Sequence, residues 1–301
     1  MQALWMILAS FAFATMGVGI KVTSESFNVG ELLFYRGLVG VVFTAAIMRA
    51  RGIAVKTPVP AMHLWRTFVG TVSMAAWFYG IAYLPLATAM TLNYMSGVWI
   101  AAFLVGGALV GSNEQSRAQS QNQGALVLTV LAAFAGVVML LRPTIAQNQI
   151  FAGLIGLLSG VGAALAYLQV TALARVGEPA TRVVFYFAVG TLLGGLMGMG
   201  YLGISPWHQV TLGAALWIIP IGLLASVGQW CMTRAYAQGP TLVAANLQYS
   251  GIVFAAIYGL VLFGDEIPLI GWLGMALIVA SGIAATLLTH RALPDNQEEQ
   301  R

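Results

Sequence analysis

Charged residues are scarce in this chain of 301 residues. Asp, Glu, Lys and Arg make up 7% of it, while hydrophobic residues make up 59%. A soluble domain carries about 25% charged residues, so this composition excludes an ordinary water-exposed surface. A spanning helix needs about 20 apolar residues to cross a hydrocarbon core of about 30 Å, and ten such segments with short loops account for nearly the whole chain. The sequence therefore predicts an all-α polytopic membrane protein.

Side chains that bind metals or carry out catalysis are also few. The single cysteine, Cys231, excludes an intrachain disulfide, and no Cys/His cluster predicts a metal site. The nine acidic residues and three histidines all fall in or beside predicted loops. No HExxH, GxSxG or P-loop motif occurs, so we expect neither an enzyme nor a cofactor. A proton-coupled carrier usually keeps an acid or a histidine within the membrane, so their absence there favours uncoupled transport.

Ten continuously apolar segments, each too long for a strand, predict ten spanning helices. The first has no basic residue before it and is long for a signal-peptide core, so we expect a retained helix. The predicted spans are 3–22, 30–48, 64–84, 87–110, 124–141, 150–174, 182–203, 211–236, 241–263 and 268–288.

The basic residues are distributed unequally between the two sides of these spans. Because cytoplasmic loops are enriched in Lys and Arg, the crowded side predicts that both termini are cytoplasmic. The net charge of +4 does not predict nucleic-acid binding, since the charges form no basic face. The crowded side carries Arg49, Arg51, Lys56, Arg66, Arg117, Arg175, Arg182, Arg234, Arg291 and Arg301.

Short motifs recur at an interval of about half the chain. Ala82-Tyr83 returns as Ala235-Tyr236 and Ser96-Gly97 as Ser250-Gly251, offsets of 153 and 154 residues. Five spans per repeat place the second copy in the membrane in the opposite sense, and inverted repeats of this kind are typical of secondary transporters with a site near the midplane. We therefore expect repeats at 1–148 and 149–290, followed by a cytoplasmic tail at 291–301.

Aromatic and amide side chains occur on equivalent spans of the two repeats. Aromatic faces stack on apolar rings and attract ammonium groups, while amides and hydroxyls orient polar atoms, so such side chains would suit an amphipathic organic solute. The alternative for the tyrosines and tryptophans is an interfacial belt. The predicted cavity-lining residues are Ser10, Lys21, Tyr79, Tyr83, Asn93, Tyr94, Tyr167, Gln169, Gln229, Trp230, Asn246 and Tyr249.

Four basic residues near or within the spans have more than one interpretation. Lys21 and Arg36 either attract a substrate carboxylate or snorkel and pair with Glu25 or Glu31. Arg66 and Arg234 lie near predicted cytoplasmic ends, which favours membrane anchors.

Small residues recur at intervals of four along the seventh span. Gly190, Gly194 and Gly198 form two consecutive GxxxG steps, which permit close helix packing. We expect packing within a monomer, with a homodimer interface as the alternative.

The order of these motifs resembles the EamA-type branch of the drug/metabolite transporter superfamily. The similarity rests on Ala82-Tyr83-Leu84-Pro85-Leu86-Ala87-Thr88-Ala89, on the small-residue-rich first helix ending in Lys21, and on Gly264-Asp265-Glu266-Ile267-Pro268. Within this branch the chain is most similar to YddG-type bacterial exporters of aromatic amino acids, which implies a location in a bacterial inner membrane. The resemblance implies a ten-helix basket whose cavity is lined by helices 1, 3, 4, 6, 8 and 9, alternating access, and export of amino acids and related metabolites. It also implies an alternative, efflux of quaternary cations such as methyl viologen.

Overall fold

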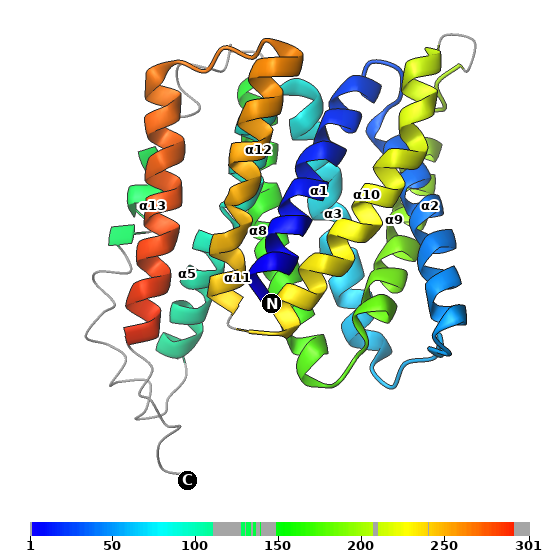
Figure 1. Cartoon of the computed structure of the whole chain (residues 1–301), viewed down its shortest axis with the longest axis horizontal. Coiled ribbons are helices and arrows are strands. Elements are labelled where there is room, and N and C mark those ends of the chain that lie inside the picture. Colours follow the sequence, from blue (N-terminus) through cyan, green and yellow to red (C-terminus); the bar gives the residue numbers. More distant parts are fainter. Residues whose placement is uncertain are drawn as a thin grey trace.

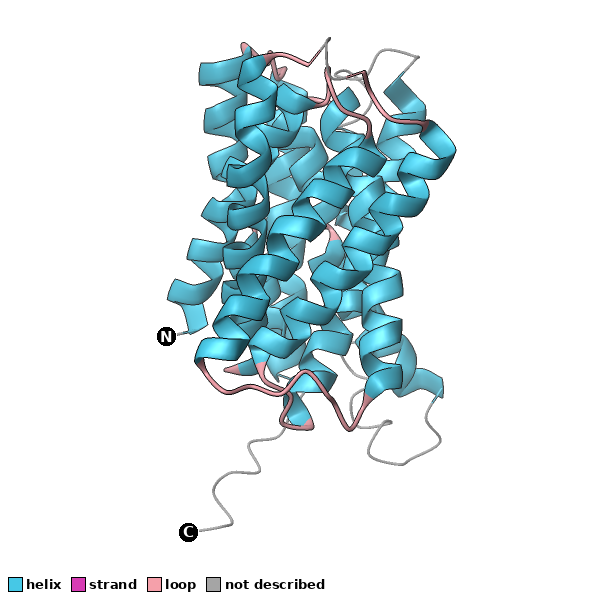
Figure 2. Cartoon of the chain, turned by 90° about the vertical axis from the view of Figure 1, so that its right-hand side faces the viewer, coloured by secondary structure: helices cyan, strands magenta, loops and turns pink. Residues whose placement is uncertain are grey.

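The computed structural model describes residues 2–110, 149–206, 210–239 and 241–291, together with the helical residues 128, 129, 131–133, 135, 136 and 139. These residues form a bundle of long, roughly aligned helices, and α1 begins and α13 ends toward the same end of it (Figures 1 and 2). The all-α prediction is confirmed. The helices are α1 (Gln2–Thr23), α2 (Val29–Ala50), α3 (Pro60–Tyr83), α4 (Leu86–Tyr94), α5 (Ser96–Val110), α8 (Ile150–Arg175), α9 (Ala180–Leu202), α10 (Leu212–Ala237), α11 (Thr241–Gln248), α12 (Ser250–Tyr258), the π-helix η4 (Gly259–Phe263) and α13 (Leu269–Arg291).

Nine of the ten predicted spans coincide with a helix or with a run of helices. Among the described residues, seven helical spans are long and apolar enough to cross a membrane. α3 and α13, of 24 and 23 residues, also have the length of a spanning helix. Much of the predicted span at 124–141 and most of the tail at 291–301 lie outside the described residues.

Local sequence signals set several helix ends. Asn28 and Glu31 form a reciprocal capping box at the start of α2, since the Asn28 side chain accepts from the Glu31 N–H and the Glu31 carboxylate accepts from the Asn28 N–H. Pro60 occupies the first turn of α3, where its missing N–H costs no helical hydrogen bond. Thr211 caps α10 by accepting from the Ala214 N–H, 3.2 Å away.

Two spans that the sequence predicts as continuous are interrupted. The fourth breaks at Met95 between α4 and α5, and the ninth breaks at Tyr249 between α11 and α12. The two breaks contact each other: a β-carbon added at Gly251 would lie 2.6 Å from Tyr94 Cε2, and one added at Gly97 would lie 2.8 Å from the Tyr249 hydroxyl. The Tyr94 ring beside the first break thus occupies the space next to Gly251, and the Tyr249 ring at the second break occupies the space next to Gly97.

Helices α2 and α9 pack backbone against backbone. A β-carbon added at Gly195 would lie 2.6 Å from the Phe34 Cα, and one at Gly198 would lie 2.9 Å from the Gly30 Cα. Gly190 and Gly194 instead face the side chains of Thr67 and Thr71 of α3. All three glycines of the Gly190/Gly194/Gly198 row therefore pack against helices of the same chain.

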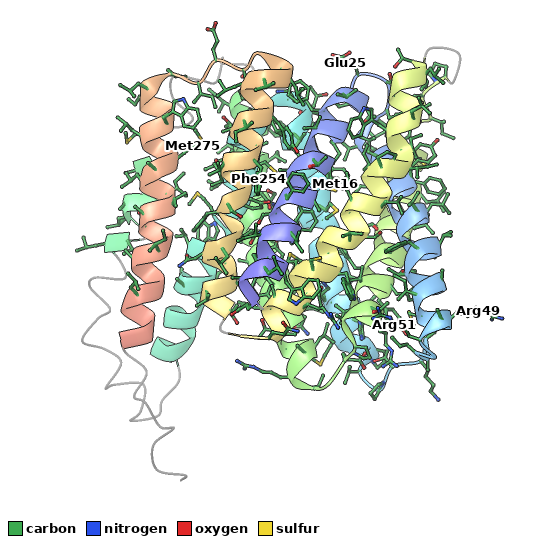
Figure 3. The ribbon with its side chains drawn as sticks, viewed as in Figure 1. Met16, Glu25, Arg49, Arg51, Phe254 and Met275 are labelled. Atoms are coloured by element: carbon green, nitrogen blue, oxygen red, sulfur yellow. The ribbon has the colours of Figure 1, made fainter. Side chains whose placement is uncertain are left out.

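The two ends of the bundle differ in charge. Arg49 and Arg51 lie at the end where α1 begins and α13 ends, and Glu25 lies at the opposite end (Figure 3). Below, these are the terminal end and the far end.

Candidate functional site

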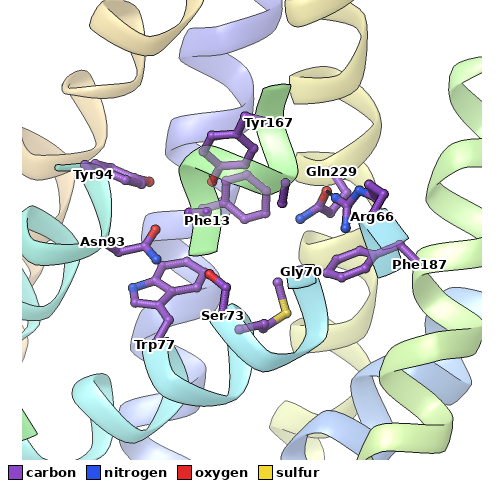
Figure 4. Close-up of a pocket in the computed structure, with 13 residues that line it drawn as sticks. Phe13, Arg66, Gly70, Ser73, Trp77, Asn93, Tyr94, Tyr167, Phe187 and Gln229 are labelled. Atoms are coloured by element: carbon purple, nitrogen blue, oxygen red, sulfur yellow. Dashed lines mark hydrogen bonds between the residues drawn. The ribbon is translucent and has the colours of Figure 1, made fainter. Parts of the chain in front are cut away.

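A pocket lies among α1, α3, α4, α8, α9 and α10. The space between its side chains, with the open space at its mouth included, is about 390 Å³. The lining comes from both parts of the chain, before and after residue 149 (Figure 4). It consists of Phe13, Arg66, Gly70, Ser73, Met74, Trp77, Asn93, Tyr94, Ala163, Ala166, Tyr167, Phe187 and Gln229.

Aromatic rings make up much of the wall. Phe13 meets Trp77 edge to face, with ring centroids 6.1 Å apart. The Tyr167 ring stacks on Tyr236 at 5.1 Å, and the Tyr167 hydroxyl accepts a hydrogen bond of 3.1 Å from Gln248 Nε2. These contacts fix the ring orientations, so the pocket has rigid apolar faces.

Polar groups gather at the α4 side of the pocket. The Asn93 amide donates to Ser159 Oγ over 3.0 Å, and Ser159 Oγ donates to the Gly156 carbonyl over 2.6 Å. The Tyr94 hydroxyl and the Trp77 indole N–H are buried and have no hydrogen-bond partner among the described residues. This side of the pocket therefore presents unused polar atoms to whatever enters it.

Arg66 lies on the opposite side of the pocket and is 2% exposed. Its Nη2 donates to Gln229 Oε1 over 3.3 Å, and its guanidinium carbon lies 3.8 Å from the centroid of the Phe187 ring. No acidic side chain is among the described residues that line the pocket. A cation thus faces the pocket with an amide and an aromatic face as its neighbours.

The interpretation of Arg66 as a cytoplasmic anchor is wrong. α3 begins at Pro60, which places Arg66 more than one turn inside the helix, and its side chain turns inward toward Gln229. A signal for this was available: Arg66, Gly70, Ser73 and Trp77 are spaced by four, three and four residues, which puts them on one helix face. All four line the pocket.

The pairing expected for Lys21 and Arg36 is also wrong. Lys21 Nζ binds Asp265, with N–O distances of 3.0 and 3.2 Å, and Arg36 Nη1 donates to Thr191 Oγ1 over 3.0 Å. Glu31 instead accepts from the backbone N–H of Ser205 over 2.9 Å and from its hydroxyl. The sequence could not reveal these partners, because each lies more than 150 residues away along the chain. Neither Lys21 nor Arg36 is among the pocket-lining residues.

Four of the twelve predicted lining residues line this pocket: Asn93, Tyr94, Tyr167 and Gln229. Tyr79 and Tyr83 lie along a separate groove, with their rings tilted to each other and the ring centroids 4.6 Å apart, and Tyr83 is 55% exposed. Trp230 packs edge to face on Trp5 at 5.4 Å, close to Arg234.

The remaining predicted residues lie around the pocket but not in its lining. Ser10 is buried and donates to the Gln248 carbonyl over 3.3 Å. Tyr249 is buried at the break between α11 and α12, and Asn246 is half-buried one turn before it. Gln169 is half-buried on α8. Ser10 and Tyr249 support neighbouring elements, because both are fully packed between helices.

The chain matches a known family over most of its length. Residues 1–109 and 150–287 match the EamA-like transporter family. The chain is 31% identical over 286 residues to the pseudopaline exporter CntI of Pseudomonas aeruginosa, covering 92% of this chain and 90% of that one. It is also 25% identical over 290 residues to a riboflavin transporter of Vibrio cholerae, with coverage of 93% and 90%.

A solved crystal structure has the same fold, with a TM-score of 0.66 at 20% identity, covering 96% of this chain and 98% of the other. The named relatives are transporters, which points to membrane transport and not to catalysis. This multi-pass membrane protein therefore belongs to the EamA-like transporter family.

Proposed function

We propose that the protein exports amino acids, aromatic and other amphipathic ones, and related metabolites across the bacterial inner membrane. The observation that carries this proposal is the central pocket, where rigid aromatic faces surround unpartnered polar atoms. An amphipathic solute matches both features, because its apolar part stacks on the rings and its polar part meets the amides and hydroxyls. One relative, the pseudopaline exporter, supports the direction.

The proposed mechanism is alternating access between inverted repeats at 1–148 and 149–290. Two observations support it: the family match falls into two ranges, and the pocket takes residues from both. Asn93 and Trp77 come from the first range, and Tyr167 and Gln229 from the second. A site between two halves can be opened to either side by tilting one half against the other.

Cytoplasmic termini are part of the same proposal. Arg49, Arg51, the start of α1 and the end of α13 lie at the terminal end of the bundle (Figure 3). Clusters of Lys and Arg in short loops favour the cytoplasmic side, so substrate would enter from the terminal end and leave at the far end.

Efflux of quaternary cations is the weaker alternative. Such a cation would enter a pocket that contains the Arg66 guanidinium and no acidic side chain in its described lining. Like charges in a low-dielectric site repel strongly, so the pocket disfavours a cationic substrate.

Transport in proteoliposomes tests the proposal. Radiolabelled tryptophan, phenylalanine and an aliphatic amino acid would be followed with and without an imposed pH gradient. Movement of the aromatics without a pH requirement would support an uncoupled exporter, and movement only with the gradient would refute the uncoupled part. If no amino acid moves faster than in protein-free vesicles, amino acid export is excluded.

A further inference from the structure

We propose that Arg66 binds a carboxylate of the transported substrate, so that the substrate class is small organic acids, amino acids among them. This rests on transport through the central pocket but goes beyond it, because it assigns one substrate group to one side chain.

The guanidinium has unused hydrogen-bonding capacity. An arginine side chain carries five N–H donors and no acceptor. Nη2 of Arg66 reaches Gln229 Oε1, while Nε and Nη1 are buried and have no acceptor among the described residues. The Phe187 face attracts the charge but accepts none of these hydrogen bonds in the usual geometry.

A charge in this position requires compensation. Ionisable groups within a membrane are costly and ordinarily pair with one another or line a polar cavity. Of the described acids, Glu178 and Asp265 have other partners, and neither is among the described lining of the pocket. A substrate carboxylate would supply the missing negative charge and the missing acceptors together.

The rest of the pocket also offers donors that have no acceptor. The Trp77 indole N–H is an unpartnered donor, and the Tyr94 hydroxyl can donate as well. Gln229 Oε1 already accepts from Arg66. Figure 4 shows Arg66 and Gln229 on one side of the pocket and Tyr94 and Asn93 on the other. An acceptor-rich ligand fits this arrangement, with its carboxylate at Arg66 and a second polar group toward α4.

Gly70 gives the guanidinium its space. A β-carbon added at Gly70 would run into Arg66 Nη1 and lie 2.9 Å from Phe187 Cε2. Gly70→Ala would therefore move the guanidinium while keeping its charge, which provides a second variant that tests position alone.

The experiment compares acids with their matched amides. Binding of tryptophan, tryptophanamide, indole-3-propionate and indole-3-propionamide would be measured on purified protein by ligand-dependent thermal stabilisation. Since hydrogen bonds to charged groups contribute about 1.5–3 kcal/mol, wild type should bind each acid about 10- to 100-fold more tightly than its amide. Arg66→Gln should bring this ratio close to one, and Arg66→Lys should restore part of it. Gly70→Ala should also reduce the ratio, and it replaces Arg66→Gln if that variant does not fold.

Arg36→Gln is the matched control. Arg36 is also a buried arginine over Phe187, with its guanidinium carbon 5.0 Å from the ring centroid, but it is not among the pocket-lining residues. It should keep the acid-to-amide ratio of wild type.

Three results would overturn the proposal: equal affinity for acids and amides in wild type, no binding of either acid, or an unchanged ratio in both Arg66→Gln and Gly70→Ala. Failure of the proposed function is separable. If indole-3-propionate binds through Arg66 while no amino acid is transported, amino acid export is wrong and carboxylate recognition stands.

Discussion

Asn93 and Tyr83 are ten residues apart, on either side of the turn at Leu84-Pro85-Leu86. From the sequence alone, both are predicted to line the cavity. The structure separates them. Asn93 is 3% exposed in the central pocket, whereas Tyr83 is 55% exposed and lines a different groove. The difference arises because α3 ends at Tyr83 at the far end of the bundle, while α4 carries Asn93 back inward.

We expect Asn93→Ala to lower transport severalfold with little loss of folded protein. The amide donates to Ser159 Oγ, which keeps its own bond to the Gly156 carbonyl, so the stability cost should be about 1 kcal/mol. Size-exclusion chromatography measures the amount of folded protein, and flux in proteoliposomes measures the transport rate. Their ratio gives the transport rate per folded protein. Tyr83→Ala is the control and should transport normally; an equal loss in both variants would show that the pocket assignment fails.

At this scale the sequence predicts residue types better than residue directions. The sequence identifies Asn93, Tyr94, Tyr167 and Gln229 as candidates because each is a polar or aromatic residue within a predicted span. All four line the pocket. The sequence shows how far Arg66 lies from the predicted helix end, but it does not show the direction of the side chain. That direction depends on contacts with α9 and α10, which come much later in the chain.

The contact between α2 and α9 depends on the absence of side chains at a few positions. Gly195 faces the Phe34 backbone and the Gly30 carbonyl, neither of which can move aside, whereas Gly194 faces only the Thr71 side chain. Such small-residue contacts allow the van der Waals packing that associates helices in lipid.

Gly195→Leu should therefore abolish most folded protein, more severely than Gly194→Leu. Overpacking at a rigid contact costs about 1–3 kcal/mol or more, and here the obstacle is backbone. Yield of monodisperse protein in detergent is the measurement. Gly200→Leu on the same helix is the control, because nothing lies within 4 Å of a β-carbon there; a normal yield of Gly195→Leu would rule out this packing role.

Loops at the terminal end are tied together by Glu178, which lies between α8 and α9. Its carboxylate accepts from Thr57 Oγ1 over 2.7 Å and from Arg182 Nη1 over 3.1 Å, and lies 3.2 Å from His63 Nε2. Burial alone would raise the pKa of Glu178, but the hydrogen bonds from Thr57 and Arg182, together with the nearby His63 imidazole and the Arg182 charge, outweigh it and hold the pKa below its ordinary value.

This lowered pKa makes stability depend on pH in a defined direction. The ionised Glu178 stabilises the fold at pH values above the ordinary glutamate pKa, and its contribution is lost as the pH falls through the lowered value. Glu178→Gln should lower the free energy of unfolding at neutral pH by about 1–3 kcal/mol. It should also reduce the loss of stability that wild type shows as the pH falls. Melting temperature from pH 7 down to pH 3 measures this, with exposed Glu25→Gln as the control. Identical pH profiles for wild type and Glu178→Gln would contradict it.

Over the whole molecule, a second carboxylate joins separate elements at the far end. Asp265 binds Lys21 at the end of α1 and accepts from the Leu86 N–H at the start of α4 over 3.0 Å. One side chain thus joins α1, α4 and the loop before α13. Under alternating access this contact must break for the pocket to open at that end.

Asp265→Asn should open the far end more often. Losing about 1 kcal/mol from this contact would shift the equilibrium about fivefold. The measurement is the labelling rate of Ser73→Cys by a membrane-impermeant maleimide applied at the far end, in a Cys231→Ser background. Glu266→Gln, an exposed neighbour, is the control. Unchanged labelling in Asp265→Asn would show that the contact is not a closure.

The sequence predicts the architecture of the molecule well, since apolar length and loop charge are local properties. Nine predicted spans match the described helices. It does not predict the breaks at Met95 and Tyr249, because neither position carries Gly or Pro. These breaks are stabilised by contacts between the two parts of the chain, and local propensity gives no sign of them.

Those contacts also limit how the protein can change over generations. Tyr94 fills the gap at Gly251, and Tyr249 fills the gap at Gly97, so each part of the chain carries the ring that the other part must accommodate. A methyl group gained at either glycine would require a smaller ring on the opposite part at the same time. The two parts of the chain could then no longer change independently at these positions. A chimera that takes one part from a relative would fold only when each tyrosine and the glycine that it packs against come from the same protein.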